Sequence, residues 1–247
     1  MNFTTSPFLY RLNFLIKHKA NIKIILAFLK FQFLKFFYNH FRSKEKKINK
    51  ILIKDKEVTR DDFSIYSFDW KKNLKAYKDK NIRYLEIGSF EGISAYFIHK
   101  YSKLIEIHCV DTWEGNDEYG DEIIFQNIEL NFDKNLKDIK NLKKYKTTSD
   151  AFFKDNKEQF DIIYVDGSHK YNQVKKDLIN ALKNLKFDGI IICDDYFWNL
   201  DGNKEDIPVQ AINEVVIESD LKIVAITVNQ IFLKKNKILK YSSLSWT

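Results

Sequence analysis

The chain has 247 residues, a net charge of +7, seven glycines, two prolines and two cysteines. This length suits one α/β domain with an extension. Two cysteines exclude a disulfide-framed fold, so we expect Cys109 and Cys193 to be buried free thiols in a cytoplasmic protein. Residues 1–60 hold 14 basic and three acidic residues, whereas residues 61–247 hold 27 basic and 31 acidic ones. The basic excess is therefore N-terminal, and the mildly acidic remainder argues against a nucleic-acid groove.

Residues 8–42 are rich in Phe, Leu and Ile and predict one or two helices interrupted by lysines. The longest uninterrupted apolar run, 24–29, is far shorter than the roughly 20 residues that a bilayer span needs, and the pattern of a signal peptide is missing. Two interpretations stay open: a helix lying on an anionic membrane surface, or a helix covering the core or a dimer partner. Residues 43–60 indicate a charged connector, so the predicted division is an extension over 1–60 and a catalytic domain over 61–247.

From residue 61 onward, helix and strand patterns alternate regularly. Strands are predicted over 82–87, 105–110, 143–147, 160–165 and 188–193, and helices around 92–101, 121–137, 149–156, 170–184 and 208–219. Residues 222–228 and 231–235 predict a terminal hairpin. Repeating β-α units imply a mostly parallel sheet with helices on both faces, to which the hairpin adds an antiparallel strand.

The stretch 84–92, Tyr-Leu-Glu-Ile-Gly-Ser-Phe-Glu-Gly, is the most informative part of the chain. Gly88 and Gly92 allow a tight turn and a close approach of backbone to ligand, and the helix start that follows offers free N–H groups. Asp111 ends the next strand and is suited to paired ribose hydroxyls, although it could instead cap the following turn. The G-x-x-x-G spacing lacks the G-x-G of a dinucleotide site, which disfavours NAD.

Acidic residues lie at the ends of four of the predicted strands, at Glu86, Asp111, Asp166 and Asp194-Asp195. The carboxyl ends of parallel strands share one edge of a sheet, where ligands bind. Carboxylates gathered there repel one another, and a hard divalent cation relieves that repulsion. We therefore predict Asp166, Asp194 and Asp195 as metal ligands, with helix capping as the alternative. His169 beside this group is a predicted general base, because its ordinary pKa suits proton removal near neutral pH.

Four further residues have two interpretations each. Phe90 and Trp113 could stack on a flat base or belong to the core. Ser149 and Asp150 could hydrogen-bond an adenine edge or cap the helix that begins there. The insertion over 112–146, with its aromatic residues Trp113, Tyr119 and Phe125, is expected to form part of an acceptor lid.

Five segments occur in the order of a known family: LEIGSFEG (85–92), VDTWEG (110–115), FDKN (132–135), FDIIYVDGSHKY (160–171) and GIIICDDY (189–196). On these segments, the run 61–235 resembles a class I S-adenosylmethionine-dependent methyltransferase. Within that superfamily it is similar to the small-molecule O-methyltransferases that include catechol and macrolide-sugar enzymes. The resemblance implies a Rossmann-like, seven-stranded, mostly parallel sheet with an antiparallel terminal strand, here preceded by an N-terminal helical extension.

The resemblance also implies roles for individual residues. It places S-adenosylmethionine against Glu86, Gly88, Ser89, Phe90, Gly92, Asp111, Trp113, Ser149 and Asp150. It places Mg²⁺ on Asp166, Asp194 and Asp195, with His169 as base and Asp166 beside it in catalysis. The implied reaction is methyl transfer to a hydroxyl of a small molecule, sugar or glycan.

Two rival functions stay open at the level of sequence. One is a nucleotide-linked oxidoreductase or hydroxylase-like relative on the same sheet. The other is a membrane-associated binding protein dominated by residues 8–42. Self-association and peripheral contact with the inner face of a membrane are further expectations, and the sequence does not identify the acceptor.

Overall fold

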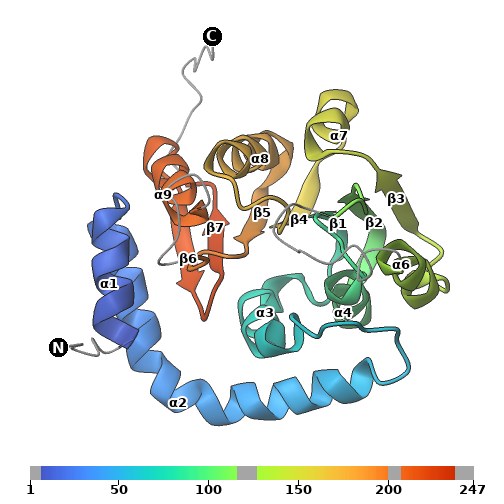
Figure 1. The fold of residues 1–247 in the computed structure, drawn as a ribbon, viewed down its shortest axis with the longest axis horizontal. Coiled ribbons are helices and arrows are strands. Elements are labelled where there is room, and N and C mark those ends of the chain that lie inside the picture. The colour runs from blue at the N-terminus through green and yellow to red at the C-terminus, as the bar shows by residue number, and fades with distance from the viewer. Residues whose placement is uncertain (1–6, 116–126, 200–206, 237–247) are drawn as a thin grey trace.

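The computed structural model describes residues 7–115, 127–199 and 207–236. Within these ranges, seven strands form one sheet in the order β3-β2-β1-β4-β5-β7-β6 (Figure 1). Strands β1 to β5 pair in parallel, and β7 runs antiparallel to both β5 and β6. The predicted Rossmann-like, mostly parallel sheet with an antiparallel terminal hairpin is confirmed.

The strands are β1 (Asn81–Ile87), β2 (Lys103–Asp111), β3 (Leu142–Lys146), β4 (Phe160–Val165), β5 (Leu185–Cys193), β6 (Lys222–Ile226) and β7 (Ile231–Lys234). The helices are α1 (Pro7–Lys17), α2 (Ile22–Leu52), α3 (Ser67–Asn73), α4 (Ile93–Tyr101), α6 (Ile128–Leu136), α7 (Ser149–Asp155), α8 (Tyr171–Asn184) and α9 (Pro208–Glu218). Two 3₁₀ turns, η1 (Ser64–Tyr66) and η2 (Lys75–Tyr77), flank α3. Of the helix predicted over 121–137, residues 128–136 form α6, and its first residues lie outside the described ranges.

The sheet lies between two helical layers. Helices α7, α8 and α9 cover one face, α3 and α4 cover the other, and α2 runs outside α3 (Figure 1). The sequence explains this arrangement: β4 is almost wholly apolar and buried, while α8 buries Val174, Leu178 and Ala181 at helical spacing. The strand ends that carry the acidic residues thus share one edge of the sheet, between the layers.

The predicted connector over 43–60 is wrong in its first part, because α2 continues as one helix to Leu52. The segment has no glycine or proline, and its Lys and Glu residues are good helix formers. Packing secures the second half: Asn49 is buried and donates to the Ser64 hydroxyl at 2.9 Å, and Arg42 forms two hydrogen bonds with Asp69. The charged run is therefore a docked helix rather than a linker.

The N-terminal helices cover part of the core, which confirms one of the two interpretations of residues 8–42. Ile24 and Phe28 on α2 are fully buried, and Phe14 and Leu15 on α1 join the same hydrophobic cluster as α8 and α9. None of the helices that the structure describes is both long and apolar enough to cross a membrane. The two cysteines are free and buried, as expected.

Candidate active site

A pocket of about 850 Å³ opens beyond the carboxyl ends of β1, β2, β4 and β5. Twelve of the thirteen predicted site residues line it: Glu86, Gly88, Ser89, Phe90, Gly92, Asp111, Ser149, Asp150, Asp166, His169, Asp194 and Asp195. The remaining one, Trp113, does not. Tyr119 and Phe125 of the expected lid lie outside the described residues.

The glycine turn between β1 and α4 needs its glycines. Gly88 and Gly92 have φ angles of +83° and +75°, in the region that side chains disfavour. A Cβ at Gly88 would lie 1.9 Å from the carbonyl oxygen of Asp166, and one at Gly92 would lie 2.7 Å from the Leu136 side chain. The turn can therefore press closely against both the neighbouring strand end and α6, leaving its backbone at the pocket wall.

Glu86 lies at the end of β1 beneath this turn and is 1% exposed. One carboxylate oxygen accepts from the Tyr84 hydroxyl at 2.9 Å, and the other accepts from the Ser94 hydroxyl in the first turn of α4. Burial raises the pKa of Glu86 to about 8, although both hydrogen bonds act to lower it. Glu86 thus ties strand to helix as well as lining the pocket.

Asp111 holds the other side of the turn. Its two carboxylate oxygens accept from the backbone N–H groups of Phe90 and Trp113, each at 2.8 Å. A carboxylate has about four lone-pair sites, so two are left for a ligand. The Trp113 indole packs on Phe132, 4.8 Å between ring centroids, and donates to the Phe90 carbonyl at 2.9 Å. Trp113 therefore supports the pocket from behind its wall.

The far end of the pocket is formed at the start of α7 and by α8. Thr148 caps α7, accepting from the Ala151 N–H, so the capping alternative for Ser149 and Asp150 is wrong. Gln173 on α8 donates to Ser149 at 3.1 Å and to Asp150 at 3.3 Å. These contacts fix both predicted adenine-edge residues at the pocket wall.

Three carboxylates meet at the ends of β4 and β5. The Tyr164 hydroxyl contacts both Asp166, at 2.9 Å, and Asp194. Burial first, and then the charges of Asp194 and Asp195, raise the pKa of Asp166 well above its ordinary value. Burial and the Asp195 charge likewise raise the pKa of Asp194 to about 7. The cluster thus holds more negative charge than its surroundings compensate.

Asp195 links the cluster to His169. The distance from His169 Nε2 to Asp195 Oδ2 is 2.6 Å, and Asn229 donates to the other oxygen of Asp195 at 2.9 Å. Asp195 has a φ of +53°, a conformation that costs energy for a non-glycine residue. The His169 ring also lies 4.5 Å from the Trp198 ring, between centroids. A histidine held between a carboxylate and an aromatic ring has few alternative orientations.

The chemistry of this donor set fits a divalent cation. Asp166, Asp194 and Asp195 offer the hard oxygen ligands that Mg²⁺ prefers. The raised pKa values of the first two reflect burial first and then mutual repulsion, and a cation would relieve the repulsion. However, Asp194 and Asp195 already accept hydrogen bonds from protein groups. Among the described residues, no group of three His, Cys, Asp or Glu side chains is arranged to hold a metal ion. Asp195 accepts two of these hydrogen bonds, so about two of its lone-pair sites are left for a cation.

The residues lining the pocket that the sequence did not point to include Arg60, Tyr66, Trp198 and Asn229. Tyr66 on η1 is 7% exposed, and burial, with the charges of Asp194 and Asp195, raises the pKa of its phenol far above the ordinary value. No motif marks these positions, because they reach the pocket from a 3₁₀ turn and loops that are distant in sequence.

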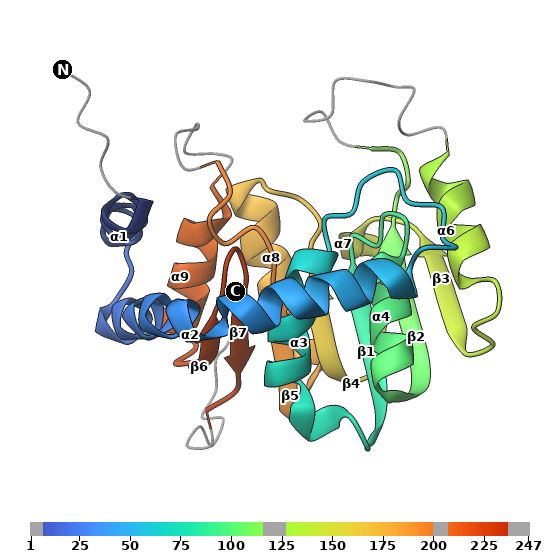
Figure 2. The ribbon, with the colours of Figure 1, turned by 90° about the horizontal axis from the view of Figure 1, so that it is seen from below.

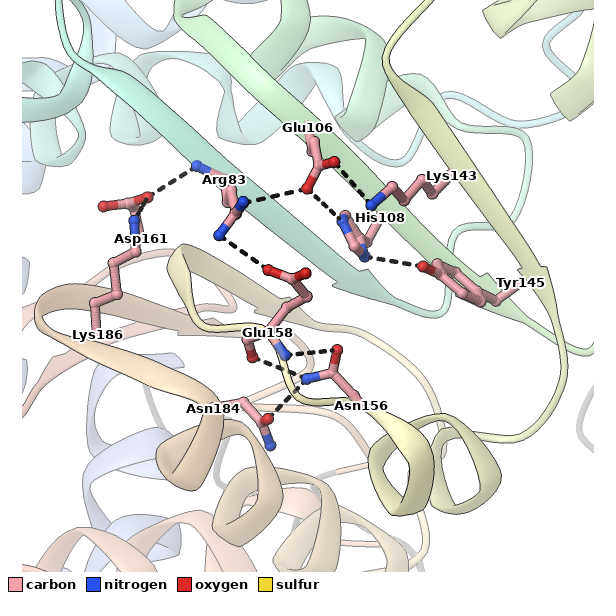
Figure 3. Close-up of polar contacts among 10 residues, drawn as sticks. All are labelled: Arg83, Glu106, His108, Lys143, Tyr145, Asn156, Glu158, Asp161, Asn184 and Lys186. Atoms are coloured by element: carbon pink, nitrogen blue, oxygen red, sulfur yellow. Dashed lines mark hydrogen bonds and ion pairs between the residues drawn. The ribbon is translucent and has the colours of Figure 1, made fainter.

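A second polar cluster lies away from the pocket, with residues from strands β1 to β5, the segment before β4 and the end of α8 (Figure 3). Buried His108 lies between Glu106, at 3.3 Å, and the Tyr145 hydroxyl, also at 3.3 Å. Arg83 and Lys143 both form ion pairs with Glu106, at 3.2 and 2.8 Å. None of the ten residues drawn in Figure 3 lines the pocket.

Comparisons with known proteins agree with this arrangement. Residues 85–196 match a family model described as a methyltransferase domain. A sequence search of curated proteins finds no match. The MycE methyltransferase from the mycinamycin biosynthetic pathway, in complex with Mg, SAH and mycinamycin VI, aligns with a TM-score of 0.51 and 15% identity over 74% of this chain and 52% of MycE.

Two further solved structures are similar. A second crystal structure of MycE, with Mg and SAH, gives a TM-score of 0.50 and 15% identity over 74% of this chain and 52% of that one. The O-methyltransferase TomG from Streptomyces achromogenes, in complex with SAM, gives a TM-score of 0.47 and 14% identity over 66% and 76%. The chain thus spans about half the length of MycE. Residues 85–196 thus match a methyltransferase domain, and the chain shares the fold of the MycE methyltransferase.

Proposed function

We propose that this protein transfers a methyl group from S-adenosylmethionine to a hydroxyl of a small molecule, sugar or glycan. The observation that carries the proposal is that one pocket holds both the glycine turn and, at the neighbouring strand ends, His169 in contact with Asp195. The family match over 85–196 favours methyl transfer over a nucleotide-linked oxidation. MycE, which shares the fold, has been solved with SAH and mycinamycin VI, which is in line with a small-molecule acceptor.

The cofactor would occupy the half of the pocket next to the glycine turn. Close approach at Gly88 and Gly92 suits the methionine portion, with Glu86, Ser89 and Phe90 beside it. The free lone pairs of Asp111 would accept the ribose hydroxyls. Ser149 and Asp150 would meet the adenine edge, and Trp113 would act indirectly, by holding Phe90 in place.

The acceptor would occupy the half of the pocket next to His169. His169 would remove the proton of the acceptor hydroxyl, and the oxygen would attack the methyl carbon as the carbon–sulfur bond breaks, leaving S-adenosylhomocysteine. Asp195, 2.6 Å from the ring, would stabilise the imidazolium that forms. Positioning of the two reactants would supply much of the acceleration.

Mg²⁺ is part of the proposal through the donor chemistry of Asp166, Asp194 and Asp195. When bound, a divalent cation lowers the pKa of a coordinated hydroxyl and orients it. Asp166, Asp194 and Asp195 are the residues that would hold the cation, and its charge would offset the repulsion among them.

Isothermal titration with S-adenosylmethionine, with and without Mg²⁺, tests cofactor and metal separately. We expect saturable binding of the cofactor, and a separate heat for Mg²⁺ that Asp194→Asn abolishes. Methyl transfer from labelled cofactor to a panel of hydroxyl acceptors then tests the reaction. Saturable binding of NAD(P) with none of S-adenosylmethionine would instead support the oxidoreductase alternative.

Four expectations about the whole chain are also proposals. They are the division into 1–60 and 61–247, a cytoplasmic location, self-association, and peripheral contact of residues 8–42 with a membrane. The contacts of Asn49 with Ser64 and of Arg42 with Asp69 cross the proposed division. Removal of residues 1–60 should therefore destabilise the domain as well as remove the extension.

A further inference from the structure

Helix α2 has one face against the protein and one face away from it. The inner face buries Ile24, Phe28 and Phe31. The opposite face, here called the outer face, carries six large apolar side chains in the first half of the helix: Ile22, Leu26, Leu29, Phe33, Phe36 and Phe37. In Figure 2, α2 lies in front of the other elements, running across the molecule.

The apolar side chains of the outer face are strongly exposed to solvent. Phe33, Phe36 and Phe37 are 68%, 82% and 54% exposed. Single exposed apolar residues are normal, but a contiguous apolar stripe on a soluble protein marks an interaction surface. The spacing of these residues, three or four apart over more than four turns, puts them on one line along the helix.

The same face gains lysines in the second half of the helix, where the exposed Ile51 also lies. At 100° per residue, Lys44 and Lys47 continue the line of Phe33 and Phe36, and both are exposed. Within α2 the acidic residue is Glu45, which points to the protein and pairs with Lys71 at 2.5 Å. The outer face therefore combines apolar and cationic side chains and has no carboxylate of its own.

This combination decides between two occupants. If two copies of the chain met through this face in antiparallel fashion, the lysines of each would lie on the phenylalanines of the other, and the face would offer them no carboxylate to pair with. If they met in parallel, the lysines would face one another across the contact. An anionic bilayer complements both halves, since acyl chains accept the apolar side chains and lipid phosphates attract the lysines.

We propose that the outer face of α2 docks the protein on the surface of an anionic lipid bilayer. The helix lies flat, with its inner face still packed on the domain, so docking needs no unfolding of the extension. This proposal does not depend on the methyltransferase reaction, because none of the outer-face residues lines the pocket.

Vesicle flotation of the full chain tests the proposal, with phosphatidylcholine vesicles compared with vesicles containing about one third phosphatidylglycerol. We expect binding to the anionic vesicles and little to the neutral ones. The variant Phe33→Gln/Phe36→Gln/Phe37→Gln should bind at least about tenfold more weakly. Lys44→Gln/Lys47→Gln should lose about 25-fold on anionic vesicles only, at about fivefold for each lysine near the surface.

Matched controls distinguish binding through this surface from non-specific binding of exposed phenylalanines and lysines to vesicles. Phe187→Gln removes a phenylalanine that is 55% exposed on β5, and Lys154→Gln/Lys157→Gln removes two exposed lysines elsewhere; both should bind vesicles as the wild type does. Each variant should keep its thermal midpoint and its affinity for S-adenosylmethionine. Equal vesicle binding by the phenylalanine variant would overturn the proposal. The proposal would also be overturned if the wild type did not bind anionic vesicles but formed a dimer, and the phenylalanine variant were monomeric.

Discussion

Two histidines in this protein each lie against a carboxylate, and their surroundings differ. His169 contacts Asp195 at the edge of the sheet, inside the pocket. His108 contacts Glu106 within the sheet, in the cluster of Figure 3 and outside the pocket. Both rings are almost completely buried, so burial alone does not separate them.

The difference lies in the cations around the acids. Arg83 and Lys143 pair with Glu106, and the Lys143 contact leads the effects that lower the pKa of Glu106 to about 2. Among the described residues, no lysine or arginine forms an ion pair with Asp166, Asp194 or Asp195. Burial first, and then the neighbouring carboxylate charges, raise the pKa values of Asp166 and Asp194.

This contrast distinguishes a structural cluster from a site. Acids that serve the fold are neutralised by neighbouring cations, so the network is complete without a ligand. Acids left together without a cation cost stability, and they are retained where a ligand or a reaction needs them.

The largest effect should come from the same substitution at the two histidines. His169→Gln should lower the turnover of methyl transfer by about 100- to 10,000-fold, the usual contribution of a positioned general base. Its affinity for S-adenosylmethionine should stay within about threefold of the wild type. His108→Gln should keep its turnover within about threefold, because the ring does not line the pocket.

Steady-state kinetics and cofactor titration on both variants make this check, with circular dichroism to show that each folds. A His108→Gln variant that loses turnover as severely as His169→Gln would remove the distinction between the clusters. A His169→Gln variant that loses cofactor binding would assign His169 to the cofactor instead of to the base.

Glu86 provides a third kind of acid, buried without a cation and satisfied by hydroxyl donors. Its pKa is raised to about 8, whereas the unfolded chain ionises near 4.5. Below pH 4.5 both states are protonated and there is no penalty. Between about 4.5 and 8 only the unfolded state loses its proton, so the contribution of Glu86 to stability falls as pH rises.

Glu86→Gln removes this titration while keeping the shape of the side chain. The difference in free energy of unfolding, variant minus wild type, should therefore increase by about 3 to 5 kcal/mol as the pH rises from 4.5 to 8. Denaturant titrations at several pH values would measure it. If the difference in free energy of unfolding between the variant and the wild type stayed constant with pH, Glu86 would already be ionised in the folded protein.

Much of the fold could be predicted from the sequence, because the patterns that determine most strands and helices lie within short segments of the chain. Strand β4 was predicted at its observed bounds because its apolar run has sharp ends. The alternation of strand and helix patterns was enough to predict a mostly parallel sheet. The extent of α2 was not predicted, because buried contacts such as Asn49 with Ser64 fix its second half. Tyr66 and Asn229 could not be found either, since only the folded chain brings them to the acids.

The site was predicted as a set of strand ends, and its internal contacts were not. Nothing in the spacing reveals that Asp195 faces His169, or that Trp113 packs on Phe132 behind the pocket wall. Such contacts depend on side-chain directions at turns with positive φ angles, as at Asp195, which no pattern of residue types encodes.

Asp111 should separate the two halves of the pocket. In Asp111→Asn, the single amide oxygen can accept from only one of the Phe90 and Trp113 N–H groups, and the side chain loses charge and acceptor capacity toward the ribose hydroxyls. Affinity for S-adenosylmethionine should fall about 10- to 100-fold, the cost of a lost charged hydrogen bond. At saturating cofactor the turnover should stay within about threefold of the wild type. Equal losses in turnover and affinity would show that the cofactor half and the acceptor half of the pocket do not function independently.

The smallest effect should come from the compensated acid, Glu106. Its lowered pKa means that its contribution to stability is complete above about pH 4.5 and is lost as pH falls toward 2. Because the side chain is partly exposed and its pairs are screened, Glu106→Gln should cost only about 1 kcal/mol at pH 7. This deficit should shrink below pH 4.5, the reverse of the behaviour of Glu86→Gln. If both variants responded to pH in the same direction, neighbouring cations could not be what distinguishes the two kinds of acid.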